Sequence, residues 1–320
     1  MRVGFVGLGN LGRPLATSLV TAGHEVVVHD LVRNAAEPLI ELGAEWAASP
    51  REACRRCQAV ITCLPSPTAI ADVVEGRHGL AEGLNRGSTW IDMSTSDRDE
   101  LLRLASVVAE RGAGCLEAPV TGGVHRAEAG TITVIVGGDR ALFERHVPLF
   151  EAMGGRVFYM GPLGSASVIK VITNLLAFVQ LVATGEALML ARRAGLDLAQ
   201  SYHVIAASSG NSFVHETEGQ LILNGSYDIG FTMDLACKDL GFAHELGREL
   251  GTPLELAGLV EQIFVRAREQ YGGSAQSPMV VKLLEDALGV DLRADGFPAR
   301  LEPCAGYPPG GPSPSSEPPR

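Results

Sequence analysis

The sequence has little positive charge to offer a polyanion. Its 320 residues include 26 Lys and Arg against 37 Asp and Glu, so the formal net charge is −11. The basic residues are scattered and form no cluster of the kind that binds nucleic acid. We therefore expect no nucleic-acid partner.

Cysteine is sparse, and its spacing supports neither a metal site nor a disulfide framework. The six cysteines are at positions 54, 57, 63, 115, 237 and 304. Cys54 and Cys57 form one C-x-x-C pair, but no second Cys pair or His pair follows to complete a tetrahedral site. We expect reduced thiols and no bound metal.

The sequence also lacks a recognisable leader or membrane anchor. Its first residues show no charged segment followed by an apolar stretch and a cleavage site. The longest apolar segment, 168–191, contains Lys170, Asn174, Gln180 and Glu186, which are costly in lipid. We expect a cytoplasmic protein, without a membrane partner, in which this segment is a buried helix.

The first half of the chain alternates short apolar runs with helical patterns. The runs cover residues 3–6, 25–29, 59–64, 89–93, 115–118 and 131–136. Such alternation predicts an α/β domain with a Rossmann-type, doubly wound parallel sheet over residues 1–161.

The sequence Gly161-Pro162-Leu163-Gly164 ends this pattern, and the strand signals stop there. Helices are predicted over 165–194, 199–207, 212–223, 233–250, 253–271 and 278–288. We therefore predict an all-α domain over 162–291. Residues 292–320 are rich in Gly, Pro and Ser, which predicts a disordered tail.

The first predicted strand ends in a G-x-G-x-x-G turn that opens a helix. The turn consists of Gly7, Leu8, Gly9, Asn10, Leu11 and Gly12. Gly7 would make the tight turn, Gly9 would let the backbone approach a pyrophosphate, and Gly12 would allow close helix packing. In this strand-turn-helix context the motif predicts a dinucleotide site, whereas a purely structural glycine turn is the alternative.

An acidic residue ends the second predicted strand. Asp30 lies about twenty residues beyond the turn, where a carboxylate accepts hydrogen bonds from the adenosine ribose. It would repel a 2′-phosphate, so it favours NAD over NADP. Arg33 would offset this repulsion if its loop folded back, which keeps NADP as an alternative, and Asp30 as an ordinary turn residue is another.

Lys170 and Asn174 lie four residues apart in the long apolar helix, so they project from one face. Burial would lower the pKa of the Lys170 ammonium towards neutrality, which suits a general acid/base. Asn174 would then orient the substrate oxygen. The spacing alone is equally compatible with a lysine that snorkels to solvent from a helix edge.

Five sequence blocks, in order between residue 2 and about 288, give the chain a family resemblance. They are the glycine turn with 23–26, and the blocks 92–95, 117–123, 161–174 and 238–240. With them the chain resembles the β-hydroxyacid dehydrogenase family, which includes 3-hydroxyisobutyrate dehydrogenases and tartronate semialdehyde reductases.

The resemblance implies a role for each matching residue. It makes Lys170 and Asn174 the catalytic pair, and it gives the substrate to Thr121, Gly122, Gly123 and Ser94. It adds Leu64, Pro65, Thr95 and Lys238 to the cofactor site. Many relatives have Ser at the position of Thr121 and Asn at that of Leu175, so we expect a pocket of altered size and polarity.

These features predict an NAD-dependent oxidoreductase that moves hydride between the nicotinamide and a small, carboxylate-bearing 3-hydroxy acid. One alternative is a reductase of a semialdehyde such as tartronate semialdehyde. Reduction of a cyclic imine is another, but Lys170 argues against it, and a non-catalytic nucleotide sensor on the same fold is a third. The long apolar helix also predicts a homodimer or homotetramer.

Overall fold

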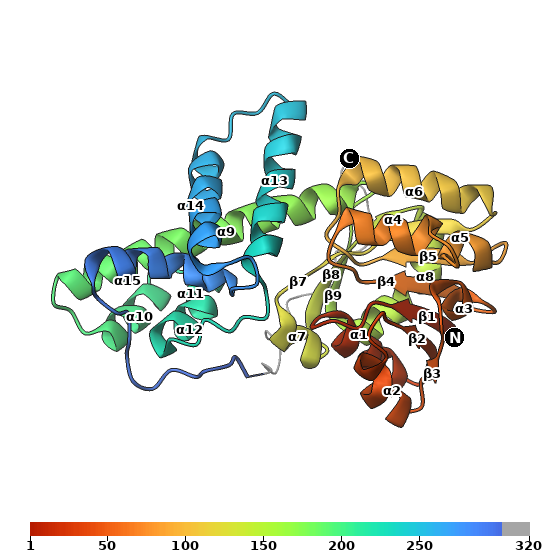
Figure 1. The fold of residues 1–320 in the computed structure, drawn as a ribbon, viewed down its shortest axis with the longest axis horizontal. Coiled ribbons are helices and arrows are strands. Elements are labelled where there is room, and N and C mark those ends of the chain that lie inside the picture. The colour runs from red at the N-terminus through yellow and green to blue at the C-terminus, as the bar shows by residue number, and fades with distance from the viewer. Residues whose placement is uncertain (303–320) are drawn as a thin grey trace, which may run out of the picture. The chain divides into compact units, whose positions relative to one another are not determined.

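The computed structural model describes residues 1–302, and these divide into two compact units. The first covers residues 1–170 and the second covers residues 171–302. The division falls inside the continuous helix α9 (Ser165–Arg193), which Figure 1 shows as one unbroken element. The boundary that the sequence indicates near residue 161 stays a prediction.

The first unit is built on a nine-stranded sheet with the order β3-β2-β1-β4-β5-β6-β8-β7, in which β9 also pairs with β8. The strands are β1 (Arg2–Val6), β2 (Glu25–His29), β3 (Glu45–Trp46), β4 (Ala59–Thr62), β5 (Thr89–Asp92), β6 (Gly114–Glu117), β7 (Val120–Thr121), β8 (Ile132–Gly138) and β9 (Gly154–Tyr159).

The sheet is parallel from β3 to β6, but β8 runs antiparallel to β6 and β7. A parallel return after β6 usually needs a crossover helix long enough to span the sheet. The connection here holds only the five-residue helix α7 (Val124–Glu128) and the short β7. The prediction of a parallel sheet is therefore wrong at this end.

Helices cover both faces of the sheet, because successive strand residues point to opposite sides. In β2, Val26 and Val28 belong to one hydrophobic cluster and Val27 to the other. One cluster includes residues of α1 (Gly12–Thr21), α2 (Glu37–Glu41), α7 and α8 (Arg140–Met153), and the other includes residues of α3 (Pro50–Cys54), α4 (Pro67–Glu75), α5 (Leu80–Gly83) and α6 (Arg98–Glu110). The 3-10 helix η1 (Arg33–Ala36) precedes α2. The predicted doubly wound α/β fold is confirmed.

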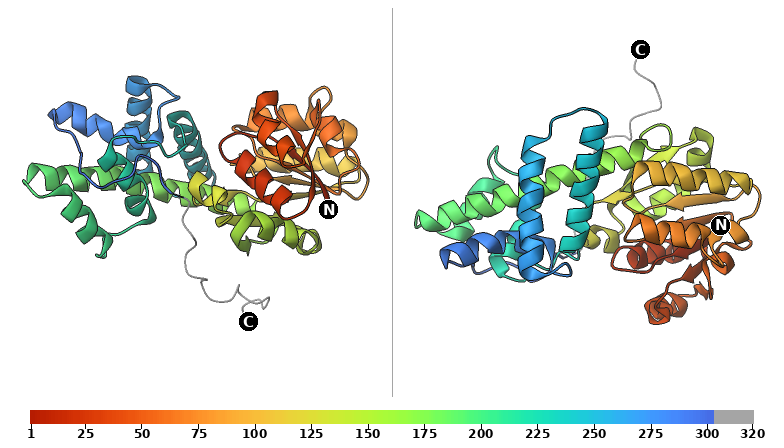
Figure 2. Two further views of the ribbon diagram at one scale, coloured as in Figure 1. Left: turned by 90° about the horizontal axis from the view of Figure 1, so that it is seen from below. Right: turned by 45° about the horizontal axis from the view of Figure 1, so that its top comes forward.

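The second unit is helical and has its own hydrophobic core. Besides most of α9 it contains α10 (Leu198–Ala206), α11 (Phe213–Glu216), α12 (Glu218–Asn224), α13 (Met233–Glu249), α14 (Glu255–Tyr271), the 3-10 helix η2 (Ser277–Val281) and α15 (Lys282–Leu288). Helices α13 and α14 lie side by side (Figures 1 and 2). Within the described part of this unit the only strand-like pairing is the bridge between Thr232 and Gln276.

Two predicted helices are interrupted. The helix predicted over 212–223 is divided at Thr217, whose backbone has φ −106° and ψ −78°. The Thr217 hydroxyl donates to the carbonyl of Phe213 at 2.8 Å, and such a bond bends a helix. The helix predicted over 278–288 begins as η2 and becomes α-helical only at Lys282.

Helix α9 is less buried than the sequence predicts. It is the only helix among residues 1–302 that is long and apolar enough to cross a membrane by length and composition, a test that core helices of soluble proteins also pass. Only 28% of its most apolar window is buried within the single chain, and Leu176 and Leu190 are 53% and 73% exposed. The expected burial of this helix is therefore only partly found within one chain.

Part of the predicted disordered tail packs on the helical unit. Leu292 is completely buried, and the Arg293 guanidinium contacts Glu285 at 2.7 Å and the Tyr227 hydroxyl at 2.9 Å. The Phe297 ring lies 4.9 Å from that of Tyr202. These contacts contradict the predicted disorder for the start of the tail, and residues 303–320 lie outside the described residues.

Candidate active site

The turn after β1 has the geometry of a dinucleotide cradle. A Cβ atom at Gly7, where φ is +98°, would lie 2.3 Å from the carbonyl oxygen of Cys63. At Gly12 it would lie 1.9 Å from the carbonyl oxygen of Gly7. At Gly9 it would meet nothing within 4 Å. The fold itself thus requires Gly7 and Gly12, whereas Gly9 leaves the backbone open to a ligand, as the motif predicts.

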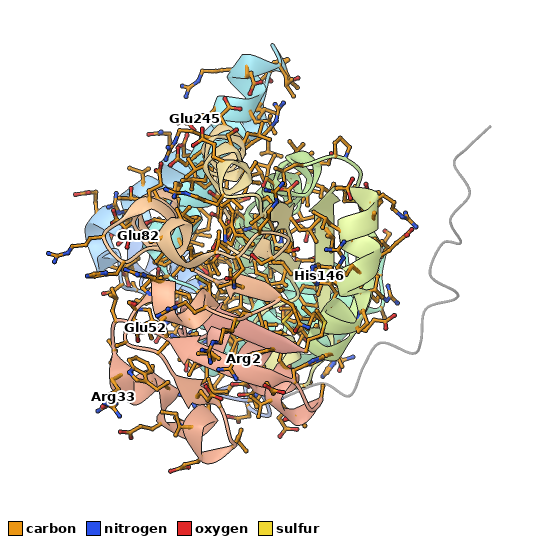
Figure 3. The ribbon with its side chains drawn as sticks, turned by 90° about the vertical axis from the view of Figure 1, so that its right-hand side faces the viewer. Arg2, Arg33, Glu52, Glu82, His146 and Glu245 are labelled. Atoms are coloured by element: carbon orange, nitrogen blue, oxygen red, sulfur yellow. The ribbon has the colours of Figure 1, made fainter. Side chains whose placement is uncertain are left out.

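Asp30 connects this turn to the end of β2. Its Oδ2 accepts a hydrogen bond from the Leu8 backbone at 2.7 Å, and its Oδ1 accepts one from Val32 at 2.8 Å. Each carboxylate oxygen has a second lone pair for a ribose hydroxyl. The Arg33 guanidinium lies 5.8 Å from the centre of the Trp46 ring, on the exposed edge of this unit (Figure 3). The residues present therefore fit a dinucleotide.

A buried carboxylate links the ends of β4 and β5. Asp92 Oδ1 accepts hydrogen bonds from the hydroxyls of Thr62 at 2.7 Å and Ser94 at 2.6 Å. Trp90 donates to the Thr62 hydroxyl, and the Leu64 backbone donates to that of Ser94 at 2.9 Å. Burial raises the pKa of Asp92 to about 6 against the effect of these bonds.

This network gives Ser94 a supporting position. Its hydroxyl donates inward to Asp92 and accepts from Leu64, so it holds the loop that continues into Pro65. The role of Ser94 towards substrate, and those of Leu64, Pro65 and Thr95 towards the cofactor, stay predictions.

The predicted substrate loop requires its glycines. Thr121 ends β7, and Gly122 and Gly123 follow with φ of +125° and +83°, a region that side chains disfavour. A Cβ atom at Gly122 would also lie 2.8 Å from the Arg126 side chain. Two glycines in these conformations can present backbone N–H groups to an anion.

Glu117, at the end of β6, caps the start of α9. Its Oε1 accepts hydrogen bonds from the backbones of Gly164 at 2.6 Å and Ala166 at 2.9 Å. Its Oε2 accepts from the Ser167 backbone at 2.8 Å and also from the Ser167 hydroxyl. The Glu117 carboxylate is 1% exposed.

Lys170 and Asn174 are buried side chains one turn apart on α9. They are 8% and 9% exposed. A lysine that snorkels from a helix edge keeps its ammonium in water. The burial of Lys170 therefore favours a functional role over a snorkelling side chain.

Asp239 joins Asn174 to Lys238 within the helical unit. Its Oδ2 accepts from the Asn174 amide at 2.6 Å, and its Oδ1 accepts from the Lys238 ammonium at 2.7 Å. Asp239 is 1% exposed, and Lys238 Nζ also lies 4.8 Å from the centre of the Phe242 ring. The sequence contains the block Lys238-Asp239-Leu240, but its spacing gave Asp239 no role.

Among the described residues, the cysteine side chains make none of the hydrogen bonds given above. Within residues 1–302 they are free thiols, and burial raises the pKa of Cys54 to about 12 and that of Cys57 to about 11. Among the same residues, no group of three or more His, Cys, Asp or Glu is placed to hold a metal ion. Cys304 lies outside the described residues.

Comparison with known proteins matches the two halves of the chain to two domain families. Residues 2–161 match the NAD-binding domain of 6-phosphogluconate dehydrogenase. Residues 164–284 match the NAD-binding domain of NADP-dependent 3-hydroxyisobutyrate dehydrogenase.

Whole proteins show the same relationship. The 2-(hydroxymethyl)glutarate dehydrogenase of Eubacterium barkeri is 32% identical over 91% of this chain and 97% of its own length. The mitochondrial 3-hydroxyisobutyrate dehydrogenase of Mus musculus is 34% identical over 82% of this chain and 80% of its own. The structure of Mycobacterium tuberculosis 3-hydroxyisobutyrate dehydrogenase with L-serine superposes with a TM-score of 0.79, at 28% identity over 88% of this chain and 98% of that one. The chain therefore belongs to the β-hydroxyacid dehydrogenase family of NAD(P)-binding oxidoreductases, as its sequence motifs indicate.

Proposed function

We propose that this protein is a dehydrogenase that oxidises a small 3-hydroxy acid of the 3-hydroxyisobutyrate type, with Lys170 as general acid/base and NAD as the preferred cofactor. The observation that supports this most directly is the burial of Lys170 and Asn174 on one helix face. Asp239 accepts from the Asn174 amide nitrogen, which fixes the orientation of that amide.

Each residue of the site has one task in this reaction. NAD(P), when bound, accepts the hydride from the carbon that bears the hydroxyl. Lys170 takes the hydroxyl proton, Asn174 orients the substrate oxygen, and Thr121 with the N–H groups of Gly122 and Gly123 holds the carboxylate. Fixing the anion aligns the reacting carbon, which contributes to the rate through proximity. In the reverse direction the same residues would serve a semialdehyde reductase.

The compounds in the relatives' names narrow the substrate class. 3-Hydroxyisobutyrate, 2-(hydroxymethyl)glutarate and L-serine each carry a hydroxymethyl group on the carbon next to the carboxylate. We infer that this chain recognises that unit, a primary alcohol two bonds from the carboxyl carbon. Its remaining substituent would set the specificity.

The choice of NAD rests on Asp30. The carboxylate directly follows β2 and lies beside the glycine turn, where it would accept hydrogen bonds from the ribose and repel a 2′-phosphate. Arg33 is the cation nearest to Asp30 in sequence. Its guanidinium lies over the Trp46 ring, and none of the described ion pairs joins it to Asp30.

We also propose that the exposed apolar side chains of α9 are buried in a homodimer or homotetramer. Ile172, Leu176 and Leu190 are 39%, 53% and 73% exposed in the single chain. Uncovered apolar side chains along one long helix favour association. Light scattering of the purified protein tests this, and a monomer would contradict it.

The central experiment replaces Lys170. Lys170→Ala and Lys170→Met should lower kcat by about 10²- to 10⁴-fold, the usual contribution of a general acid/base, while NAD still binds. The chain has three lysines, and Lys282, in an exposed ion pair with Asp286, provides the control Lys282→Ala. Turnover should be measured with NAD and NADP on 3-hydroxyisobutyrate, L-serine, 2-(hydroxymethyl)glutarate and glycerate. Unchanged turnover in both Lys170 variants would refute the proposed function.

A further inference from the structure

The first turn of α9 is capped by a residue from far away in the sequence. Helix starts leave backbone N–H groups without partners inside the helix, and a nearby Ser, Thr, Asp or Asn usually accepts from them. Here Ser165 donates to the carbonyl of Pro162 at 3.1 Å, but Ala166 and Ser167 donate to Glu117, about fifty residues earlier. The cap therefore fixes the helix to the sheet.

The surroundings of Glu117 are shaped to hold a carboxylate. A buried carboxylate is costly unless several donors satisfy it, and this one receives four hydrogen bonds at the positive end of a long helix. Gly137 pairs with Glu117 in the β6–β8 register. Because Gly137 has no side chain, there is room for the Glu117 carboxylate, whereas a Cβ atom at position 137 would lie 2.3 Å from Glu117 Oε1.

The helix that this carboxylate caps carries part of the site, and the predicted substrate loop follows soon after the strand that holds Glu117. On the helix, Lys170 follows Ser167 by three residues and Ala166 by four, so its side chain leans back over the capped turn. Along the chain, Thr121 at the end of β7 follows Glu117 at the end of β6 by four residues, and it opens the predicted substrate loop. The buried Glu117 side chain thus connects the first turn of α9, which precedes Lys170, to the segment that leads from β6 to the predicted substrate loop.

We propose that Glu117 is a positioning residue for the reaction, which fixes the location of the Lys170 ammonium relative to the substrate loop. This inference rests on the proposed role of Lys170. Glu117 itself contacts backbone and Ser167 rather than reacting atoms, so its removal should affect the rate of the chemical step more than the binding of substrate or cofactor.

The test uses Glu117→Gln and Glu117→Asp. In Glu117→Gln, one of the two carboxylate oxygens becomes an NH₂ group, which cannot accept from the two donors that face it. In Glu117→Asp, the shorter side chain moves the carboxylate away from the α9 N–H groups by one methylene. Misplacement by about 1 Å can cost about 10²-fold in rate, so we expect kcat to fall by about 10- to 100-fold in Glu117→Gln, and by less in Glu117→Asp. The KM for the hydroxy acid and the Kd for NAD should each change by less than about threefold, as expected when only the chemical step is affected. Glu110→Gln, an exposed carboxylate at the end of α6, is the matched control.

Two further variants keep the test decisive. If Glu117→Gln does not fold, Ser167→Ala removes only the hydroxyl contact, and we expect kcat to fall by about 2- to 5-fold, as for one lost hydrogen bond, while the protein still folds with Tm lowered by only about 2–4 °C. In a Lys170→Ala background, Glu117→Gln should leave the residual rate unchanged, because a residue that acts through Lys170 has nothing left to position.

The outcomes separate this inference from the proposed function. Wild-type kcat in Glu117→Gln, or a further fall of the same size in the Lys170→Ala background, would overturn the positioning role while Lys170 remained the base. Full turnover in Lys170→Ala itself would overturn both.

Discussion

The buried carboxylate of Asp92 should make the stability of the protein depend on pH in an unusual direction. Its pKa in the folded protein is about 6, against 3.8 for the free side chain, because burial penalises the charged form. The folded state therefore binds this proton more tightly than the unfolded state does. The stability from this group is fully present below about pH 4 and is lost as pH rises through about 6, the opposite of a salt-bridged carboxylate.

Asp92→Asn isolates this effect. All three described hydrogen bonds to the Asp92 side chain end on Oδ1, which an asparagine retains. The difference between the two pKa values corresponds to about 3 kcal/mol. We therefore expect Asp92→Asn to gain up to about 3 kcal/mol relative to the wild type between pH 4 and pH 7, with little difference at pH 4.

Urea unfolding at several pH values, followed by tryptophan fluorescence, would measure this difference. Trp90 is fully buried and donates to Thr62 in the same network, so it reports on this part of the sheet. Asp72→Asn, at an exposed position of α4, serves as the control. A stability difference between Asp92→Asn and wild type that stayed constant from pH 4 to pH 7 would refute the reasoning.

The remaining predictions concern the dinucleotide site. Asp30→Ala should lower the ratio of kcat/KM with NAD to kcat/KM with NADP. An unaltered ratio would show that groups other than Asp30 distinguish the two cofactors. Gly9→Ala should weaken NAD binding by about tenfold or more, the loss of 1.4 kcal/mol, with Tm preserved, since its Cβ meets no protein atom. Gly12→Ala should instead lower stability by about 1–3 kcal/mol, because its Cβ meets the Gly7 carbonyl. Calorimetry and thermal unfolding distinguish the two, and equal effects on both properties would contradict this division.

The fold was predictable where the chain repeats a local pattern. Apolar runs of four or more residues became β1, β2, β4, β5, β6 and β8, within two residues of their predicted ends. The strands β3 and β7 are only two residues long, and no periodicity can be read from two residues. Strand β9 begins with Gly154 and Gly155, which weaken a strand signal. Its place is set by pairing with β8.

The predicted bounds of ordered segments were wrong where tertiary contacts determine them. The division at Thr217 depends on a side-chain hydrogen bond, and the positions of Leu292 and Arg293 depend on Glu285 and Tyr227. A composition rich in Gly and Pro cannot show that Arg293 has a buried carboxylate to contact. Local sequence therefore predicted disorder where a distant partner provides structure.

For the candidate site, the sequence proposes the reacting groups, and these stay predictions, but it does not reveal the buried carboxylates that support them. The glycine turn follows from residue type and spacing, whereas the catalytic role of Lys170 came from the family resemblance, because its spacing fits a snorkelling lysine equally well. Asp92, Glu117 and Asp239 lie at the same blocks, but a carboxylate in a sequence is far more often a solvated surface group. Only the structure shows that each of the three is 1% exposed.

These three carboxylates share one physical property that links stability to geometry. Taking a carboxylate out of water costs several kcal/mol, and hydrogen bonds recover that cost only when their donors lie in the right places. Asp92 requires the position of Ser94 and thereby of Leu64, Glu117 requires the first turn of α9, and Asp239 requires the amide of Asn174. A folded state in which all three carboxylates are hydrogen-bonded therefore also fixes the Leu64 loop, the start of α9 and the Asn174 amide. On this reasoning, a relative that keeps the lysine but replaces one of these carboxylates with an apolar residue should retain the fold and lose rate.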